Sequence, residues 1–100
     1  MTLEDMAQVK ADFVRSAQDA ADIGVDWLEL HCAHGYLLSS FISPLTNQRT
    51  DTYGGSLENR MRLPLEIVKQ VRKSVGKDFI ICYRLSMLDL VEGGNSWNEI

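Results

Sequence analysis

Hydrophobic positions near the start of the chain recur at helical spacing. They are three or four residues apart, which places them on one face of an α-helix: Met6, Val9, Phe13, Ala17 and Ala20 or Ala21. Thr2 is a suitable N-cap because its hydroxyl can accept a backbone N–H of the first turn, and Gly24 tolerates the left-handed backbone that ends many helices. We therefore predict an amphipathic helix of about five turns between Thr2 and Gly24.

Two runs of mostly apolar residues predict strands. Residues 25–31, VDWLELH, follow a turn and are apolar at most positions, which favours a well-covered strand. Residues 78–85, DFIICYRL, have the same character and end in a charge at Arg84. After this second strand we expect a loop containing Gly93 and Gly94, then Ser96 as the cap of a further helix.

Periodicity stops between about Cys32 and Gly55. The segment is rich in turn residues, among them Pro44 and Asn47, and includes a possible short helix from Leu37 to Ile42. A connection of about two dozen residues is unusual in a compact domain. It therefore indicates either a functional loop or an element that the pattern does not reveal.

A second amphipathic helix is predicted from Ser56 to about Gly76. Its apolar face is predicted to hold Leu57, Met61, Leu65, Val68, Val71 or Arg72, and Val75. Arg60 belongs to the predicted polar side. Pro64 removes one backbone hydrogen bond, so we expect a kink there or a first turn separate from the main helix.

The order of elements is helix, strand, long loop, helix, strand, loop. Such alternation favours parallel strands joined by helices, in an open α/β sheet or a (β/α)8 TIM barrel. Distinctive polar groups lie at the carboxyl end of each strand, His31 with the HCAHGY loop at the first and Arg84 at the second, which is where barrel enzymes build their sites. An open sheet would usually carry a glycine-rich nucleotide motif, and none occurs. We therefore predict an α/β fold in which residues 1–100 form about two helix–strand units of the eight in a barrel.

Composition narrows the classes of partner. The chain has 100 residues, is 45% hydrophobic and has a formal net charge of −4, so no basic excess suggests nucleic acid. The longest apolar run, near Phe79 to Tyr83, is far shorter than the ~20 residues that cross a bilayer, and the start lacks a signal-peptide pattern. We expect a cytoplasmic location, with a small-molecule substrate and neither a nucleic-acid nor a membrane partner. Cys32 and Cys82 are expected to be buried free thiols without a redox role.

The sequence HCAHGY, residues 31–36, carries the densest chemistry. The spacing of these residues is compatible with three interpretations. They are a loop whose imidazoles bind backbone groups, a catalytic site and a metal site. Zinc needs three or four ligands, and the chain offers no further histidine and no thiol pair beside His31 and His34. Metal binding is therefore disfavoured, whereas the other two possibilities stay open.

A longer pattern surrounds these residues. The run ELHCAHGYLLSSFISPLTNQRTDTYGGSLENRMRLPLEIVKQVR resembles the Old Yellow Enzyme family of FMN-dependent ene reductases, and FIICYRLSMLDLVEGG is similar to its 2,4-dienoyl-CoA reductase branch. The resemblance covers roughly Ala20 to Gly94. It implies a (β/α)8 barrel with FMN at the carboxyl ends of the strands and NAD(P)H as hydride donor. Any iron–sulfur cluster or FAD domain would lie beyond Ile100.

The resemblance also implies roles for four residues. His31 and His34 would bind the carbonyl oxygen of the substrate, Tyr36 would give a proton to one alkene carbon, and Arg84 would lie beside the flavin. The residue types suit these roles, because fixed donors stabilise negative charge that develops on an oxygen. Tyrosine, with a reference pKa of about 10, keeps its proton at neutral pH. A guanidinium stays charged beside an anionic reduced flavin.

The remaining polar residues of the pattern are expected to be structural. Hydrogen bonds and ion pairs are predicted to attach the long loop through Arg49, Asp51, Asn59 and Arg60. The function that follows is an FMN-dependent NAD(P)H oxidoreductase that reduces an activated C=C bond of an enone or dienoyl-CoA. The alternatives are a flavin amine dehydrogenase-like relative and an inactive structural fragment of such a barrel. The exact substrate, the nicotinamide preference and the oligomeric state do not follow from the residues.

Overall fold

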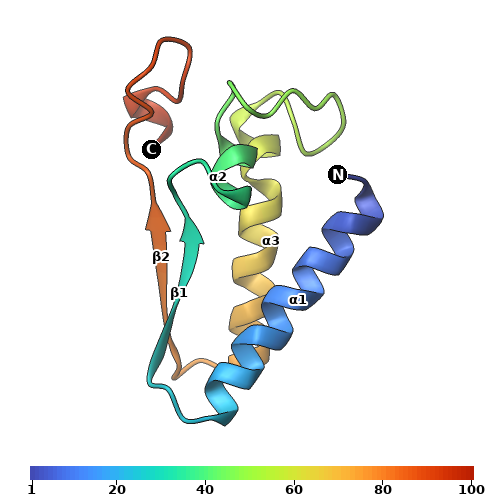
Figure 1. Ribbon diagram of the computed structural model, residues 1–100, viewed down its shortest axis with the longest axis vertical. Coiled ribbons are helices and arrows are strands. Elements are labelled where there is room, and N and C mark those ends of the chain that lie inside the picture. The colour runs from blue at the N-terminus through green and yellow to red at the C-terminus, as the bar shows by residue number, and fades with distance from the viewer. The chain divides into compact units, whose positions relative to one another are not determined.

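The computed structural model describes residues 1–100 and contains three α-helices, two strands and one 3-10 helix (Figure 1). In chain order the elements are α1 (Leu3–Asp22), β1 (Trp27–Cys32), α2 (Leu37–Ile42), α3 (Leu57–Val75), β2 (Ile80–Leu85) and the 3-10 helix Trp97–Glu99. β1 and β2 are neighbours in a two-stranded parallel sheet. The residues form two compact units, Met1–Leu30 with Leu65–Cys82 and His31–Pro64 with Tyr83–Ile100.

Helix α1 begins and ends as its sequence predicts. Thr2 and Asp5 form a capping box, in which Asp5 N donates to Thr2 Oγ1 at 3.1 Å and Thr2 N donates to Asp5 Oδ2 at 2.7 Å. These hydrogen bonds lower the pKa of Asp5. Beyond the C-cap residue Ile23, Gly24 has φ +88°, a backbone conformation that favours glycine.

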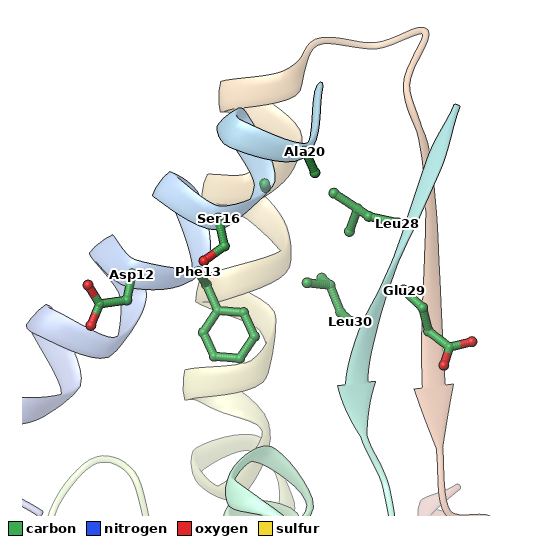
Figure 2. A pocket seen from close by; sticks show the side chains of 8 residues that line it. Asp12, Phe13, Ser16, Ala20, Leu28, Glu29 and Leu30 are labelled. Carbon is green, nitrogen blue, oxygen red and sulfur yellow. The ribbon is translucent and has the colours of Figure 1, made fainter. Parts of the chain in front are cut away.

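Strand β1 is covered on one face. Leu30 and Cys32 are buried, whereas Trp27 is 53% exposed and Glu29 is also exposed. Figure 2 shows Leu28 and Leu30 pointing toward α1 and Glu29 pointing away from it. The predicted covering of this strand is present on one face only, because the helices of this chain pack on one side of the strand.

Helix α3 runs without interruption through Pro64. The separate first turn considered from the sequence is therefore wrong. Ser56 caps the helix as predicted, since its Oγ accepts a hydrogen bond from Asn59 N at 3.3 Å. Gly76, with φ +85°, follows the last helical residue.

The buried stripe of α3 differs from the predicted one. Leu63, Ile67 and Val71 are fully buried, whereas Leu65, which was assigned to the apolar face, is 45% exposed. Arg60, which was assigned to the polar side, is only 6% exposed. Arg60 shares the buried face with these residues, and the hydrogen bonds of its guanidinium to Ile42 O and Gly55 O satisfy its donors there.

Hydrogen bonds from buried side chains hold the long loop in the second unit. Arg60 donates from Nε to Ile42 O and from Nη1 to Gly55 O, both at 2.7 Å. Asn47, 8% exposed, donates from Nδ2 to Phe41 O at 2.7 Å and also to Tyr53 O. The structure confirms that polar side chains of the sequence pattern, Arg60 among them, attach the long loop. Asn47 also attaches it, which was not predicted.

The predicted short helix and the final cap are both present. α2 spans Leu37–Ile42 as expected. Ser96 forms a capping box with Glu99, but the element that it starts is a single 3-10 turn. No helix in the structure combines the length and apolar character needed to cross a lipid bilayer.

Candidate functional site

Two of the predicted site residues occupy equivalent places on neighbouring strands. His31 is the last residue but one of β1, and Arg84 is the last but one of β2. Tyr83 is hydrogen-bonded to Cys32, so these two side chains share the face of the sheet on which Cys32 is buried. Because side chains alternate along a strand, His31 and Arg84 share the opposite face.

A tight turn after β1 carries the second histidine. Tyr36 N donates to Ala33 O at 3.3 Å and closes the turn. His34 has φ 61° and Gly35 has φ 75°, so both residues have a left-handed backbone. Glycine adopts this conformation at no steric cost, but a histidine there has to be held by its surroundings.

Two serine hydroxyls hold this turn. Ser86, the residue after β2, accepts a hydrogen bond from His34 N at 2.9 Å. Ser39, in the first turns of α2, accepts one from Gly35 N at 3.3 Å. Neither serine is predicted from the sequence. The only signal was the place of Ser86 beyond a strand end, which is too common to identify a residue.

Helix α2 positions Tyr36. Tyr36 is the N-cap residue, and its carbonyl accepts the first helical hydrogen bond, from Ser40 N at 2.8 Å. Its side chain makes no capping hydrogen bond and is 64% exposed. The buried Leu38 and Phe41 anchor the helix, so the backbone of Tyr36 is fixed while its ring faces outward.

The turn brings three rings together. The centroids of the His31 and His34 rings are 5.4 Å apart with an interplanar angle of 76°, an edge-to-face arrangement. The centroids of His31 and Tyr36 are 5.2 Å apart. His31 is half-buried and His34 is exposed. Three groups that can donate hydrogen bonds thus gather at the carboxyl end of β1.

A thiol and a phenol lie on the other face of the sheet. Burial raises the pKa of the Cys32 thiol, and a hydrogen bond from Tyr83 partly offsets this rise. Burial and the hydrogen bond to Cys32 together raise the pKa of Tyr83. Both groups therefore stay protonated at neutral pH, and Cys32 is a poor nucleophile. Cys32 and Cys82 are free thiols as expected, although Cys82 is only half-buried.

Two hollows differ in their relation to the predicted residues. One, of about 330 Å³, lies between α1 and β1 and is walled mainly by apolar side chains that include Phe13, Leu28 and Leu30 (Figure 2). The other, of about 300 Å³, is bordered by His34, Gly35 and Ser86. Only the second touches the candidate site. The structure contains no group of three or more His, Cys, Asp or Glu side chains arranged to hold a metal ion.

Comparison with known proteins assigns the chain to a family. The model of the NADH:flavin oxidoreductase / NADH oxidase family matches residues 1–100. The chain belongs to this family. The resemblance found in the sequence is thereby confirmed at the level of the family.

Curated relatives are similar along nearly the whole chain. An NADH oxidase of Thermoanaerobacter brockii is 46% identical over 99 residues, which are 99% of this chain and 15% of that protein. An NADPH dehydrogenase of Halalkalibacterium halodurans is 42% identical over 99 residues, 99% of this chain and 29% of that protein. The chain thus spans less than a third of the length of these relatives.

Solved structures agree with the fold. A 2-naphthoyl-CoA reductase in complex with 2-naphthoyl-CoA matches 99% of this chain and 15% of its own with a TM-score of 0.96 at 41% identity. The Old Yellow Enzyme from Pichia sp. AKU4542 matches 94% of this chain and 24% of its own with a TM-score of 0.85 at 46% identity. These matches confirm the predicted fold class, a partial (β/α)8 barrel.

Proposed function

We propose that the protein containing this chain is an FMN-dependent NAD(P)H oxidoreductase that reduces an activated C=C bond. The observation that carries the proposal is the gathering of His31, His34 and Tyr36, with ring centroids 5.2 and 5.4 Å from that of His31, at the carboxyl end of a barrel strand. Family membership adds flavin and nicotinamide chemistry. The substrate class is an enone or an enoyl thioester such as a dienoyl-CoA.

Arg84 has hydrogen-bond donors that fit one edge of a flavin. Arg84 lies on the same face of the sheet as His31, and its guanidinium is a permanent cation with several N–H donors. These properties suit the carbonyl-bearing pyrimidine edge of FMN. When bound there, FMN would supply the hydride-transfer chemistry between NAD(P)H and the alkene. Arg84 would stabilise the negative charge of the reduced form by binding that edge.

The two histidines are proposed to bind the substrate carbonyl. Hydride addition to the alkene develops negative charge on this oxygen, and donors that are already in position lower the barrier without reorganisation. His31 is held in β1, while His34 is held in its turn by Ser86. Both imidazoles would donate to one oxygen, which polarises the adjacent C=C bond.

Tyr36 is proposed to supply the proton. Its hydroxyl makes no capping bond, its ring is 64% exposed, and it lies beside His31. A phenol is protonated at neutral pH and can transfer its proton to a carbon that carries developing negative charge. The α-carbon of the carbonyl compound is that carbon.

Activity is proposed for the full-length protein rather than for these residues alone. One face of β1 is exposed, and two strands cannot close a barrel of eight. The same observation favours the second candidate, in which residues 1–100 by themselves are an inactive structural part of the barrel.

The flavin absorbance of the full-length protein and its rate of alkene reduction test the proposed function. Full-length protein purified with FMN should retain a flavin spectrum and should oxidise NADH or NADPH when 2-cyclohexenone is supplied. A colourless protein that takes up no FMN would contradict the proposal. Retention of FMN without reduction of any activated alkene would reject the alkene-reductase activity and retain the flavoprotein assignment.

A further inference from the structure

The hollow beside His34 belongs to no role considered so far. The turn at His34 and Gly35, the first turns of α2 and the segment after β2 form its walls, and its volume is about 300 Å³. This size lies at the lower end of small-molecule sites. We call it the Ser39–Ser86 hollow after two of the four serines that line it. Because His34 is proposed to bind the substrate carbonyl, an extension of the substrate beyond that carbonyl would meet the hollow.

Two hydroxyl groups of the hollow have a proton to donate. Ser39 Oγ accepts from Gly35 N at 3.3 Å and Ser86 Oγ accepts from His34 N at 2.9 Å. Neither hydroxyl donates to another protein group in the structure. A hydroxyl carries one donor as well as its acceptor lone pairs, so each serine can also donate to a ligand oxygen while it holds the turn.

The other hydroxyl groups of the hollow are already donors within the protein. Ser40 Oγ donates to Leu37 O at 2.6 Å, and Thr46 Oγ1 donates to Ser40 O at 2.7 Å. Ser43 Oγ donates to Asp89 Oδ2 at 3.3 Å. A ligand oxygen would therefore find its donors at Ser39 and Ser86.

The charge of the walls restricts the ligand. Asp89 is the one carboxylate of the lining, which includes neither lysine nor arginine. Its Oδ2 accepts from Asn95 N at 2.7 Å, an ordered arrangement that keeps the carboxylate at the hollow. A phosphate or carboxylate would be repelled there without a compensating cation. Leu45, Leu88 and Val91 supply apolar contacts for a carbon chain.

We propose that the Ser39–Ser86 hollow binds a neutral carbonyl group, such as an amide, on an arm of the substrate. Ser39 and Ser86 donate to the carbonyl oxygen, and the apolar walls contact the carbon chain of the arm. This assignment rests on the proposed function, because it places the arm beyond the oxygen bound by His34. It makes the hollow a determinant of specificity, separate from the reacting atoms.

Two substrates with the same reacting ring test the assignment in the full-length FMN protein. One is a 2-cyclohexenone with an N-methylpropanamide arm, and the other has a hydrocarbon arm of the same length. We expect a higher kcat/KM for the amide substrate. Ser39→Ala and Ser86→Ala should each lower the amide-to-hydrocarbon ratio of kcat/KM by about three- to tenfold, the loss of one neutral hydrogen bond.

Matched variants separate binding from support of the turn. Ser40→Ala removes a hydroxyl from the same lining whose proton goes to Leu37 O, so it should leave the ratio unchanged. Ser86→Thr keeps the hydroxyl and should restore most of the ratio. If Ser39→Ala and Ser86→Ala lower kcat/KM equally for both substrates, the serines only support the turn and the proposal is wrong.

A binding measurement keeps this test independent of the proposed function. Saturation-transfer NMR should detect N-methylpropanamide on the full-length protein, with a signal that the Ser39→Ala/Ser86→Ala double variant loses and Ser40→Ala keeps. Equal signals from the wild type and the double variant would overturn the assignment. If the wild type and Ser40→Ala bind N-methylpropanamide and the double variant does not, but the protein reduces neither of the two cyclohexenone substrates, the proposed alkene-reductase activity is contradicted and the binding site is retained.

Discussion

At the scale of the residue, backbone geometry at two positions arranges the candidate site. His34 and Gly35 both have positive φ, and this turn brings the His34 ring to an edge-to-face contact with His31. A non-glycine residue in this region costs free energy, which the hydrogen bond from His34 N to Ser86 Oγ helps to offset. The site is thus built from backbone conformation as much as from side-chain identity.

Replacing Gly35 tests this geometry. We expect Gly35→Ala to lower the free energy of unfolding by about 1–2 kcal/mol, because a side chain disfavours φ +75°. A Cβ at this position would meet no atom within 4 Å, so the cost is conformational rather than steric. Gly35→Asn should cost less, since asparagine tolerates a left-handed backbone. Urea unfolding of the full-length protein measures both, and equal losses would show that φ is not the cause.

Tyr36→Phe tests the proton donor. A general acid usually contributes at least about 100-fold, so the rate of alkene reduction in the full-length protein should fall by this factor. The rate of flavin reduction by NAD(P)H should not change, because no proton from Tyr36 is needed in that step. Stopped-flow measurement of the two half-reactions separates them. A similar loss in both steps would reject the assignment.

At the scale of the element, one buried arginine joins several segments of the second unit. Arg60 of α3 donates to the last residue of α2 through Ile42 O and to the long loop through Gly55 O. Its Nη2 is 2.6 Å from Glu99 Oε1 of the 3-10 helix. Because Tyr36 is the N-cap residue of α2, this arginine supports the element that positions the proposed proton donor. Its burial also explains why the amphipathic pattern of α3 assigned the wrong stripe.

The Glu99 carboxylate makes part of this support sensitive to acid. Hydrogen bonds from the backbone and side chain of Ser96, and then from Arg60, lower its pKa to about 2. A depressed folded-state pKa adds stability above the unfolded value, 4.5 for glutamate, and this stability is lost as the pH falls from 4.5 toward 2. Glu99→Gln should therefore be less stable than the wild type at neutral pH, and the difference should shrink below pH 4.5.

Thermal unfolding midpoints of the wild type and Glu99→Gln across this pH range measure that difference. A difference that is constant down to pH 3 would show that Glu99 does not titrate with a lowered pKa in the folded protein.

At the scale of the whole molecule, the chain leaves apolar surface uncovered. Trp27 is 53% exposed, Ile80 57% and Leu90 90%, and the sheet has only two strands. Trp27 and Ile80 belong to the sheet, and large apolar side chains exposed in this way are typical of surfaces that contact other protein surfaces. The share of the relatives' length that the chain spans, 15% and 29% in two cases, agrees with this.

Isolated residues 1–100 should therefore behave differently from the full-length protein. We expect the isolated segment to retain no FMN on gel filtration and to bind a hydrophobic dye such as ANS, while the full-length protein retains FMN and binds little dye. Flavin absorbance and dye fluorescence measure both properties. An isolated segment that retains FMN would show that it holds the flavin without the rest of the barrel.

Local patterns predicted the element types and the capping residues because both depend on neighbours in sequence. Thr2, Ser56 and Ser96 act through residues three positions away, so the sequence alone identified them. The face of α3 that is buried depends on the partners of Arg60, the farthest of which lies 39 residues away. Sequence periodicity contains no information on such a partner.

The candidate site divides in the same way. The residue types of HCAHGY and their place at the end of a strand could be predicted locally, because strand ends and turn residues depend on nearby sequence. That His34 is held by Ser86, 52 residues away, and that His31 shares a face of the sheet with Arg84 became known only from the folded chain. Contacts between separate elements depend on how strands pair and helices pack, and this pairing is a property of the folded chain.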